Sequence, residues 1–307
     1  MLNLAFLTLA FLTLALTGCT SFRPETLVES LRVLAIKSEP AEVASGATST
    51  LTPLVVDLDP NAGGRAITYE WATCDKVPPT GTDIDVECYD DETAAFITPL
   101  PALDGGKATF TMPPHTIRDL GLPDFTGGLY VPVRLRVTAG TTKLTAFLKV
   151  RWANGLQPAN RNPALADLAY IPTADDGALP DLGQMVDPQP LPSDTAPPLV
   201  LPRGGKLRFR GSAQPDAAET YTTFTGDITD PSSITTKQTT ELVRFFWYTS
   251  EGKVNNSVTG AARPDTVLDT SKYDESVTRR DGLIDLWLVS HDERGGSEFL
   301  HRRIQMQ

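Results

Sequence analysis

Residues 131–152 read VPVRLRVTAGTTKLTAFLKVRW, and this stretch decides the fold class. Apolar and other side chains alternate through residues 131–137, which is the pattern of a half-buried strand. Residues 139–142 (AGTT) then supply a turn. A second alternating run follows, with its apolar residues on one face: Leu144, Ala146, Leu148, Val150 and Trp152. Two strands joined by a tight turn predict a β-hairpin.

The signals that precede this hairpin recur in the second half of the chain. The first half contains extended segments at residues 51–58, 67–71 (ITYEW) and 109–112. The second half contains the corresponding segments 206–210, 242–249 (LVRFFWYT), 283–290 and 297–305, and a turn at 292–296 (DERGG) joins the last two. Each half therefore shows a strand, a Trp-bearing strand, a weaker strand and a closing hairpin.

This order is typical of an immunoglobulin-like sandwich, in which a Trp on an inner strand packs in the core. The 25 Pro and 23 Gly residues also disfavour long helices. We therefore predict an all-β chain with two immunoglobulin-like β-sandwich domains in tandem after a lipoprotein signal peptide. The predicted domains are residues 31–152 and 164–307, the second with a long Pro- and Asp-rich leading loop. Residues 153–163 (ANGLQPANRNP) have the composition of a linker.

The N-terminus predicts export and lipid attachment. Residues 1–18 form a short, uncharged apolar run, as in a signal peptide. The run leads into Leu16-Thr17-Gly18-Cys19, which resembles the bacterial lipobox, with Cys19 as the lipid acceptor. No Lys or Arg precedes the run, which departs from the usual pattern, so an ordinary signal peptide or an uncleaved anchor are the alternatives. Residues 19–30 are then a lipidated tether, and Thr20 in place of Asp favours the outer membrane.

The lipobox, residues 34–43 (LAIKSEPAEV), the Trp71-x-x-Cys74 pair and the turn at 292–296 together resemble an uncharacterised type of envelope lipoprotein from myxobacteria. The resemblance covers most of the chain, but its motifs are structural. It implies an exported protein with tandem immunoglobulin-like domains. It implies no activity and carries over no binding residues.

The net charge of −11 disfavours nucleic acid as a partner, because an acidic surface repels phosphates. It also weakly disfavours anionic lipid headgroups, so membrane attachment is expected through the N-terminal lipid. We expect the protein to lie in the cell envelope, where its partner is an envelope protein or a polysaccharide. No cofactor is expected.

Cys74 and Cys88 remain once Cys19 is lipidated, and an even pair in an oxidising compartment predicts a disulfide. The alternative is two free thiols. The loop between them carries Asp83, Asp85 and Glu87, whose alternate spacing makes them weak candidates for a Ca²⁺ site. The usual Ca²⁺ loop needs Gly where Cys88 stands, so a solvated acidic loop without metal is favoured.

No catalytic residue is predicted. His291, Asp292 and Glu293 fall in or beside the predicted turn, where exposed polar side chains are common. The aromatic residues 245–248 could form a sugar-binding platform, but Trp247 is more typical of a sandwich core.

The predicted function is that of a non-enzymatic, membrane-anchored structural or interaction module of the envelope. The alternative is a carbohydrate-binding or adhesive lipoprotein, which an exposed aromatic strip on one sheet would favour. A deep pocket with convergent carboxylates would instead favour an enzyme.

Overall fold

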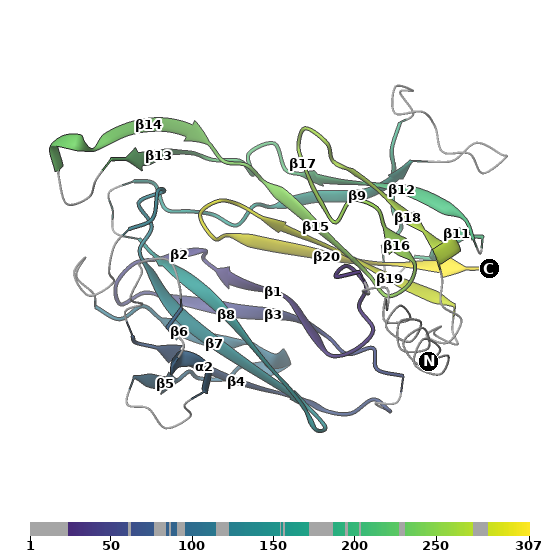
Figure 1. Cartoon of the computed structure of the whole chain (residues 1–307), viewed down its shortest axis with the longest axis horizontal. Helices are drawn as coiled ribbons and strands as arrows, with labels where there is room; N and C mark the ends of the chain where they lie inside the picture. Colours follow the sequence, from purple (N-terminus) through teal and green to yellow (C-terminus); the bar gives the residue numbers. More distant parts are fainter. Residues whose placement is uncertain are drawn as a thin grey trace, which may run out of the picture.

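The fold is almost entirely β-structure (Figure 1). Strands account for 56% and helices for 4%, which confirms the all-β prediction. The computed structural model describes residues 24–60, 63–76, 84–85, 87–90, 96–114, 123–153, 155, 157–171, 187–193, 196–202, 204–226, 231–272 and 282–307. Among these, no helix has the length and apolar character needed to span a lipid bilayer. Cys19 and the expected signal peptide lie outside the described residues.

The first sandwich consists of two sheets. One has the order β1 (Arg32–Glu39), β3 (Thr48–Val56), β6 (Ala108–Thr111). The other has the order β2 (Glu42–Val43), β8 (Thr142–Trp152), β7 (Tyr130–Ala139), β4 (Ile67–Cys74), β5 (Ile97–Pro99). All neighbours are antiparallel except β2, which runs parallel to the last strand, β8. This is the connectivity of an immunoglobulin-like domain.

The second sandwich repeats the plan. One sheet has the order β10 (Gln189–Pro190), β9 (Leu165–Ile171), β12 (Lys206–Ala213), β18 (Asp265–Asp269), β16 (Lys253–Val254). The other has the order β11 (Leu199–Leu201), β20 (Ser297–Met306), β19 (Leu283–His291), β15 (Arg244–Thr249), β17 (Val258–Gly260). Here β11 runs parallel to the last strand, β20, as β2 does to β8. The predicted tandem of immunoglobulin-like sandwiches is therefore confirmed.

The second half also contains a two-stranded ribbon, β13 (Thr220–Thr225) and β14 (Thr235–Thr240). It is formed by the Thr-rich stretch that precedes the Trp-bearing strand β15. In Figure 1 the ribbon extends away from the rest of the second sandwich, at the upper left.

The hairpin that decided the fold class forms as expected. Ala139 pairs with Thr142 across a two-residue loop, and Gly140 there has a φ of 59°, which a glycine adopts without strain. The apolar residues of β8 pack against the first core, as the alternation predicted: Leu144, Ala146, Leu148, Val150 and Trp152.

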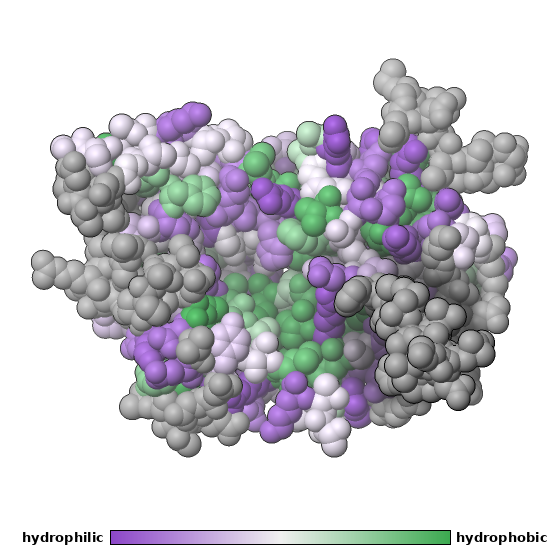
Figure 2. All heavy atoms as spheres, viewed as in Figure 1, coloured by the Kyte–Doolittle hydropathy of each residue, from purple (hydrophilic) through white to green (hydrophobic). Residues whose placement is uncertain are grey.

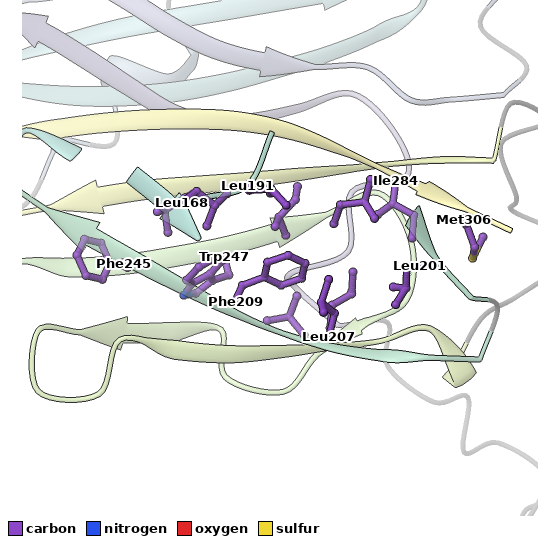
Figure 3. Packing of buried hydrophobic residues seen from close by; sticks show 14 of the residues in the cluster. Leu168, Leu191, Leu201, Leu207, Phe209, Phe245, Trp247, Ile284 and Met306 are labelled. Carbon is purple, nitrogen blue, oxygen red and sulfur yellow. The ribbon is translucent and has the colours of Figure 1, made fainter. Parts of the chain in front are cut away.

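A buried Trp anchors each core. Trp71 on β4 donates its indole N–H to the Gly106 carbonyl at 2.9 Å. Trp247 on β15 is fully buried and donates to Thr259 Oγ1 at 2.8 Å. A buried indole needs such an acceptor, because an unpaired N–H is costly. Figure 3 shows Trp247 among aliphatic and aromatic side chains from both sheets: Leu168, Leu191, Leu201, Leu207, Phe209, Phe245, Ile284 and Met306.

The two sandwiches lie face to face rather than end to end. The outer face of β1 and β3 packs against β15 and β19, so the sheets stack in four layers (Figure 1). Val28, Leu34 and Trp287 form the centre of this third apolar cluster. Strand β19 is consequently buried on both faces, which explains why residues 283–290 (LIDLWLVS) are mostly apolar rather than alternating.

Polar contacts reinforce the junction between the sandwiches. Lys37 Nζ lies 2.6 Å from Glu298 Oε2, and Ser297 Oγ donates to the Ile36 carbonyl at 2.9 Å. Asn162 donates to the Ser38 carbonyl at 2.8 Å and accepts from the Ser297 amide at 2.9 Å. Residues of the predicted linker thus take part in the junction itself.

The turn at residues 292–296 is also part of the junction, so the expectation that it exposes its polar side chains is wrong. Arg294 is 1% exposed. Its guanidinium contacts Glu241 Oε1 at 2.5 Å, Glu219 Oε2 at 2.7 Å and the Pro158 carbonyl at 3.1 Å. Burial raises the pKa of Glu241, and the hydrogen bond from Arg294 opposes that shift. The turn therefore joins the linker to the second sandwich.

Candidate functional site

A groove of about 990 Å³ lies where β15 begins, at one end of the second sandwich. The end of β12 forms one wall, and β17 with the following turn forms the other. Figure 1 shows these three strands meeting next to the base of the ribbon. The groove brings together segments 210–218, 241–245 and 256–264, which are separated in the sequence.

The floor of the groove is apolar. Val243, just before β15, and Phe245, on β15, form the floor, and Ala217 closes one end; all three are buried. Gly211 of β12 sits so close to the core that a Cβ there would lie 3.0 Å from a Leu288 methyl carbon. A larger residue at that position would displace the floor.

The rim combines apolar and cationic side chains. Leu242 is 58% exposed and Val258 is 46% exposed. Arg244 and Arg263 are exposed beside them, and within the described chain neither side chain makes an ion pair or a hydrogen bond. Arg210 differs, since Asp265 holds its guanidinium through contacts of 2.6 and 2.9 Å, and this pairing raises the pKa of Arg210.

A tight turn holds Arg263 on the rim. The amides and carbonyls of Gly260 and Arg263 hydrogen-bond to each other at 2.9 and 3.3 Å. A Cβ on Gly260 would lie 3.3 Å from the Val243 carbonyl, so the close approach of β17 to β15 favours glycine there. The position of the Arg263 side chain is therefore set by backbone contacts.

The groove has the character of a site for a ligand that is both apolar and anionic. Its volume lies at the upper end of ligand-site volumes, which run to about 1,000 Å³. The one acidic residue in its lining, Glu241, has no exposed side-chain surface and is engaged by Arg294. Arg244 and Arg263, which have no ion-pair partner among the described residues, therefore dominate the local charge of a chain whose net charge is −11.

The sequence did not predict this groove. Leu242, just before β15, and Arg244, its first residue, are exposed, whereas their neighbours Val243 and Phe245 are buried. The sequence shows a Leu and an Arg at alternate positions here, but their exposure is known only from the structure. The facing wall of β17 and its turn is visible only in the structure.

Cys74 and Cys88 form a disulfide, as predicted. It connects the end of β4 to α2 (Glu87–Asp90). Strand β7 holds this short helix through backbone carbonyls: Arg134 donates to Cys88 O at 3.0 Å and Arg136 to Tyr89 O at 2.8 Å. The disulfide thus fixes α2 on the sheet.

The acidic loop is paired with a lysine. Lys76 Nζ lies 2.5 Å from Glu87 Oε2 and 3.5 Å from Asp85 Oδ2. Asp83 lies outside the described residues. Where the structure describes the chain, no group of three or more His, Cys, Asp or Glu side chains is placed to hold a metal ion.

The aromatic residues 245–248 do not form a platform. Phe245 and Trp247 are buried in the core, 2% and 0% exposed. Phe246 packs edge-on against His291, with 5.2 Å between ring centroids, and Tyr248 packs against the apolar cluster between the sandwiches. As expected, Trp247 belongs to the core.

His291, Asp292 and Glu293 do not converge. His291 ends β19, and burial lowers its pKa. Asp292 accepts from Asn160 at 3.1 Å, whereas Glu293 accepts from the Tyr221 hydroxyl at 3.1 Å. Each carboxylate therefore has a structural partner.

Comparisons with known proteins give only distant structural likenesses. No protein-family model and no curated protein matches the chain. Murine CEACAM1b aligns over 90% of this chain and 100% of its own, with 11% identity and a TM-score of 0.22. A DUF4785 family protein from Legionella pneumophila aligns over 88% of this chain and 56% of its own, with 8% identity and a TM-score of 0.25. Domains 4 and 5 of the S-layer protein SbsC align over 90% and 98%, with 12% identity and a TM-score of 0.18. Likenesses this distant carry no functional argument.

Proposed function

We propose that this chain is an exported envelope lipoprotein without catalytic activity, and that its groove binds an extended acidic segment of another envelope protein. The apolar floor below two unpaired arginines carries the proposal. Apolar side chains of such a segment would contact the exposed Leu242 and Val258 above the buried floor, while its carboxylates would pair with Arg244 and Arg263. Attachment at Cys19, in the outer membrane of a cell of the type that the myxobacterial resemblance implies, is part of the proposal.

The positions of the tether and the groove support this arrangement. The start of the described chain lies beside the end of β15: Val28 N donates to Thr249 O at 2.8 Å, and Thr249 N donates to Thr26 O at 2.9 Å. The groove lies at the other end of the same strand, at Arg244. Six strand residues span about 20 Å, so the groove lies about that far from the point where the described chain begins.

Two observations support the absence of catalysis. The sequence contains no Gly-rich phosphate loop and no Ser nucleophile elbow. The buried carboxylates at the junction are held by structural partners, as with Glu42 and Arg151 at 3.3 Å and Glu241 and Arg294 at 2.5 Å. A broad hydrolase screen of the mature protein is expected to be negative. Activity that is lost on replacing Asp83, Asp85, Asp292 or Glu293 would overturn this part of the proposal.

The groove is tested by fluorescence anisotropy with a labelled peptide of alternating Leu and Glu, compared with matched Leu/Gln and Leu/Lys peptides. The Leu/Glu peptide should bind most tightly, and Arg244→Glu or Arg263→Glu should weaken it at least about tenfold. Arg303→Glu on β20 is the matched control, because Arg303 is an exposed arginine near the other end of the molecule. Equal binding of all three peptides, or equal loss in the control, would refute the acidic specificity. If an anionic polysaccharide such as polygalacturonate bound more tightly than the Leu/Glu peptide, the partner would be a polysaccharide and not a protein segment.

The lipid anchor is tested separately by metabolic labelling with a fatty-acid analogue. Wild-type protein should carry the label and sediment with membranes, and Cys19→Ala should abolish both. An unlabelled wild-type protein whose mature N-terminus lies elsewhere would refute the anchor while leaving the groove proposal intact.

A further inference from the structure

The ribbon of β13 and β14 presents a long strand edge to solvent. Figure 2 shows it at the upper left as a pale, near-neutral surface, which reflects its many threonines. Five of the six β14 residues are exposed. The ribbon is held together by cross-strand side-chain contacts, as between Thr225 Oγ1 and Thr235 Oγ1 at 2.7 Å.

The first edge of the ribbon is occupied. On β13, Phe224 N donates to the Phe125 carbonyl of the first sandwich at 2.9 Å. Thr222 N donates to Gln157 Oε1 of the linker at 3.2 Å. Two outward N–H groups of β13 thus have partners outside the ribbon.

The second edge is open. Glu241 N donates to Glu219 O at 2.9 Å, which sets the alternation of the ladder. Odd-numbered residues of β14 bond toward β13, so the N–H and C=O groups of Thr236, Gln238 and Thr240 point outward. No backbone hydrogen bond joins these outward groups to another part of the described chain. An edge of this kind is a template for another strand.

We propose that β14 pairs antiparallel with β14 of a second copy of this chain, about a two-fold axis at Gln238. The result is a four-stranded sheet in the order β13, β14, β14 of the second copy, β13 of the second copy. Gln238 faces Gln238 of the second copy, and Thr236 faces Thr240. Because all of these residues bond outward, the register pairs every outward N–H with a carbonyl.

The side chains fit this register. Lys237 faces Thr239 of the second copy, so no like charges are directly opposed. A register centred on Lys237 would instead place two lysines face to face and is disfavoured. Thr236 and Thr240 would form two cross-strand Thr pairs, the same contact that Thr225 and Thr235 make within the ribbon. This self-complementarity favours a second copy over an unrelated strand.

The pairing is small, since only one six-residue strand from each copy takes part. Stable interfaces bury about 1,600 Å² in total, so the dimer is expected to be weak in solution. A site-specific crosslink captures a weak pairing because it traps each encounter in the correct register. Directly opposed residues of a hydrogen-bonded pair have Cα atoms about 5.5 Å apart, within reach of a disulfide or a short bis-maleimide.

The experiment introduces single cysteines into the full mature chain carrying Cys19→Ala, in which Cys74 and Cys88 are already bonded. Gln238→Cys should crosslink to a dimer. Thr235→Cys is the matched control: it is equally exposed, but its copies would lie about 20 Å apart in this register. A mixture of the Thr236→Cys and Thr240→Cys variants should give a yield of crosslinked dimer at least tenfold higher than either variant gives alone.

A second variant tests the hydrogen bonds. Gln238→Pro removes one outward N–H per copy and leaves the β13 ladder intact, so it should raise the dimer dissociation constant about tenfold in sedimentation velocity. Lys237→Gln, which keeps every backbone donor, should leave the constant within about twofold. Crosslinking at Thr235 equal to that at Gln238, or no crosslink at Gln238, would overturn the proposal. So would a dimer that forms equally well with Pro at position 238.

Discussion

Arg294 shows what a single buried charge contributes at the junction. It is 1% exposed and lies between Glu219 and Glu241, with its guanidinium 5.2 Å from the centre of the Tyr221 ring. The exposed Arg161 pairs with the same Glu219 at 2.6 Å, but its side chain is 62% exposed. Glu219 is therefore contacted by two arginines, of which Arg294 is buried and Arg161 is exposed.

Replacing Arg294 by Met should lower the free energy of unfolding by about 3–5 kcal/mol, because a buried carboxylate is left without its partner. Arg161→Met should cost less than about 1 kcal/mol, since solvent already screens that pair. Urea unfolding followed by circular dichroism measures both. Equal losses in the two variants would show that burial is not what distinguishes them.

His291 gives the protein a defined pH response. Burial, in part against the Phe246 ring, lowers the pKa of His291 below 6.5, although the negative charge of Asp292 opposes the shift. The unfolded chain then binds more protons than the folded one once the pH falls below about 6.5, so stability is lost as pH falls through this window. The loss is at most about 1.4 kcal/mol per pH unit for one group.

His291→Asn should remove this contribution. The stability difference between wild type and variant should shrink as the pH is lowered from 7.5 to 5.5, as measured by urea midpoints. Groups that do not interact with His291, such as Glu42 and Glu241, are common to both proteins and cancel in the comparison. A difference that stays constant with pH would mean that His291 does not titrate in this range.

At the scale of elements, the disulfide is the main covalent constraint. Cys74 and Cys88 are separated by 14 residues, and closing a loop of this size stabilises the fold by roughly 3 kcal/mol in the chain-entropy model. The double variant Cys74→Ala, Cys88→Ala should lose about that much in urea unfolding. Peptide binding at the groove should be unchanged, because α2 lies on the other sandwich. Native protein with two alkylatable thiols would contradict the bridge itself.

Local pattern was sufficient to predict several elements. The alternation through residues 131–137 and the turn at Gly140 specify the β7–β8 hairpin, since both are properties of consecutive residues. The burial of Trp247 followed in the same way from its place on a central strand. Residues 283–290 were predicted as a strand, but their sequence did not indicate that β1 and β3 would cover its second face.

The junction and the groove could not be predicted because they join distant segments. Arg294 reaches back 136 residues to the Pro158 carbonyl. The groove needs β12, β15 and β17 together, and neither β12 nor β17 carries a distinctive motif. The polar composition of residues 292–296 led to the wrong prediction that their side chains are exposed. Polar turns are usually solvated, but this one is covered by the linker.

At the scale of the whole molecule, the face-to-face stacking predicts that both sandwiches unfold together. Trp287 packs with Val28 and Leu34 in a cluster that neither sandwich forms alone. Calorimetry of the wild-type protein should therefore show one transition. Trp287→Ser should separate it into two, because the loss of a large shared side chain costs about 3–5 kcal/mol at the contact. Leu242→Ser, on the exposed groove rim, is the control and should leave one transition.

The strand β15 also has a mechanical consequence. The described chain begins beside Thr249 and the groove begins at Arg244, so under the proposed anchoring and binding a pull between membrane and partner would load the two ends of this strand. Six residues of β15 pair with β19 in register, and their hydrogen bonds lie across the direction of the pull. A load along the strand is perpendicular to these bonds and is carried by the covalent backbone of β15, whereas a load across a hairpin end would open such bonds one after another. The protein should therefore resist force best in the direction in which its anchor and its partner would apply it.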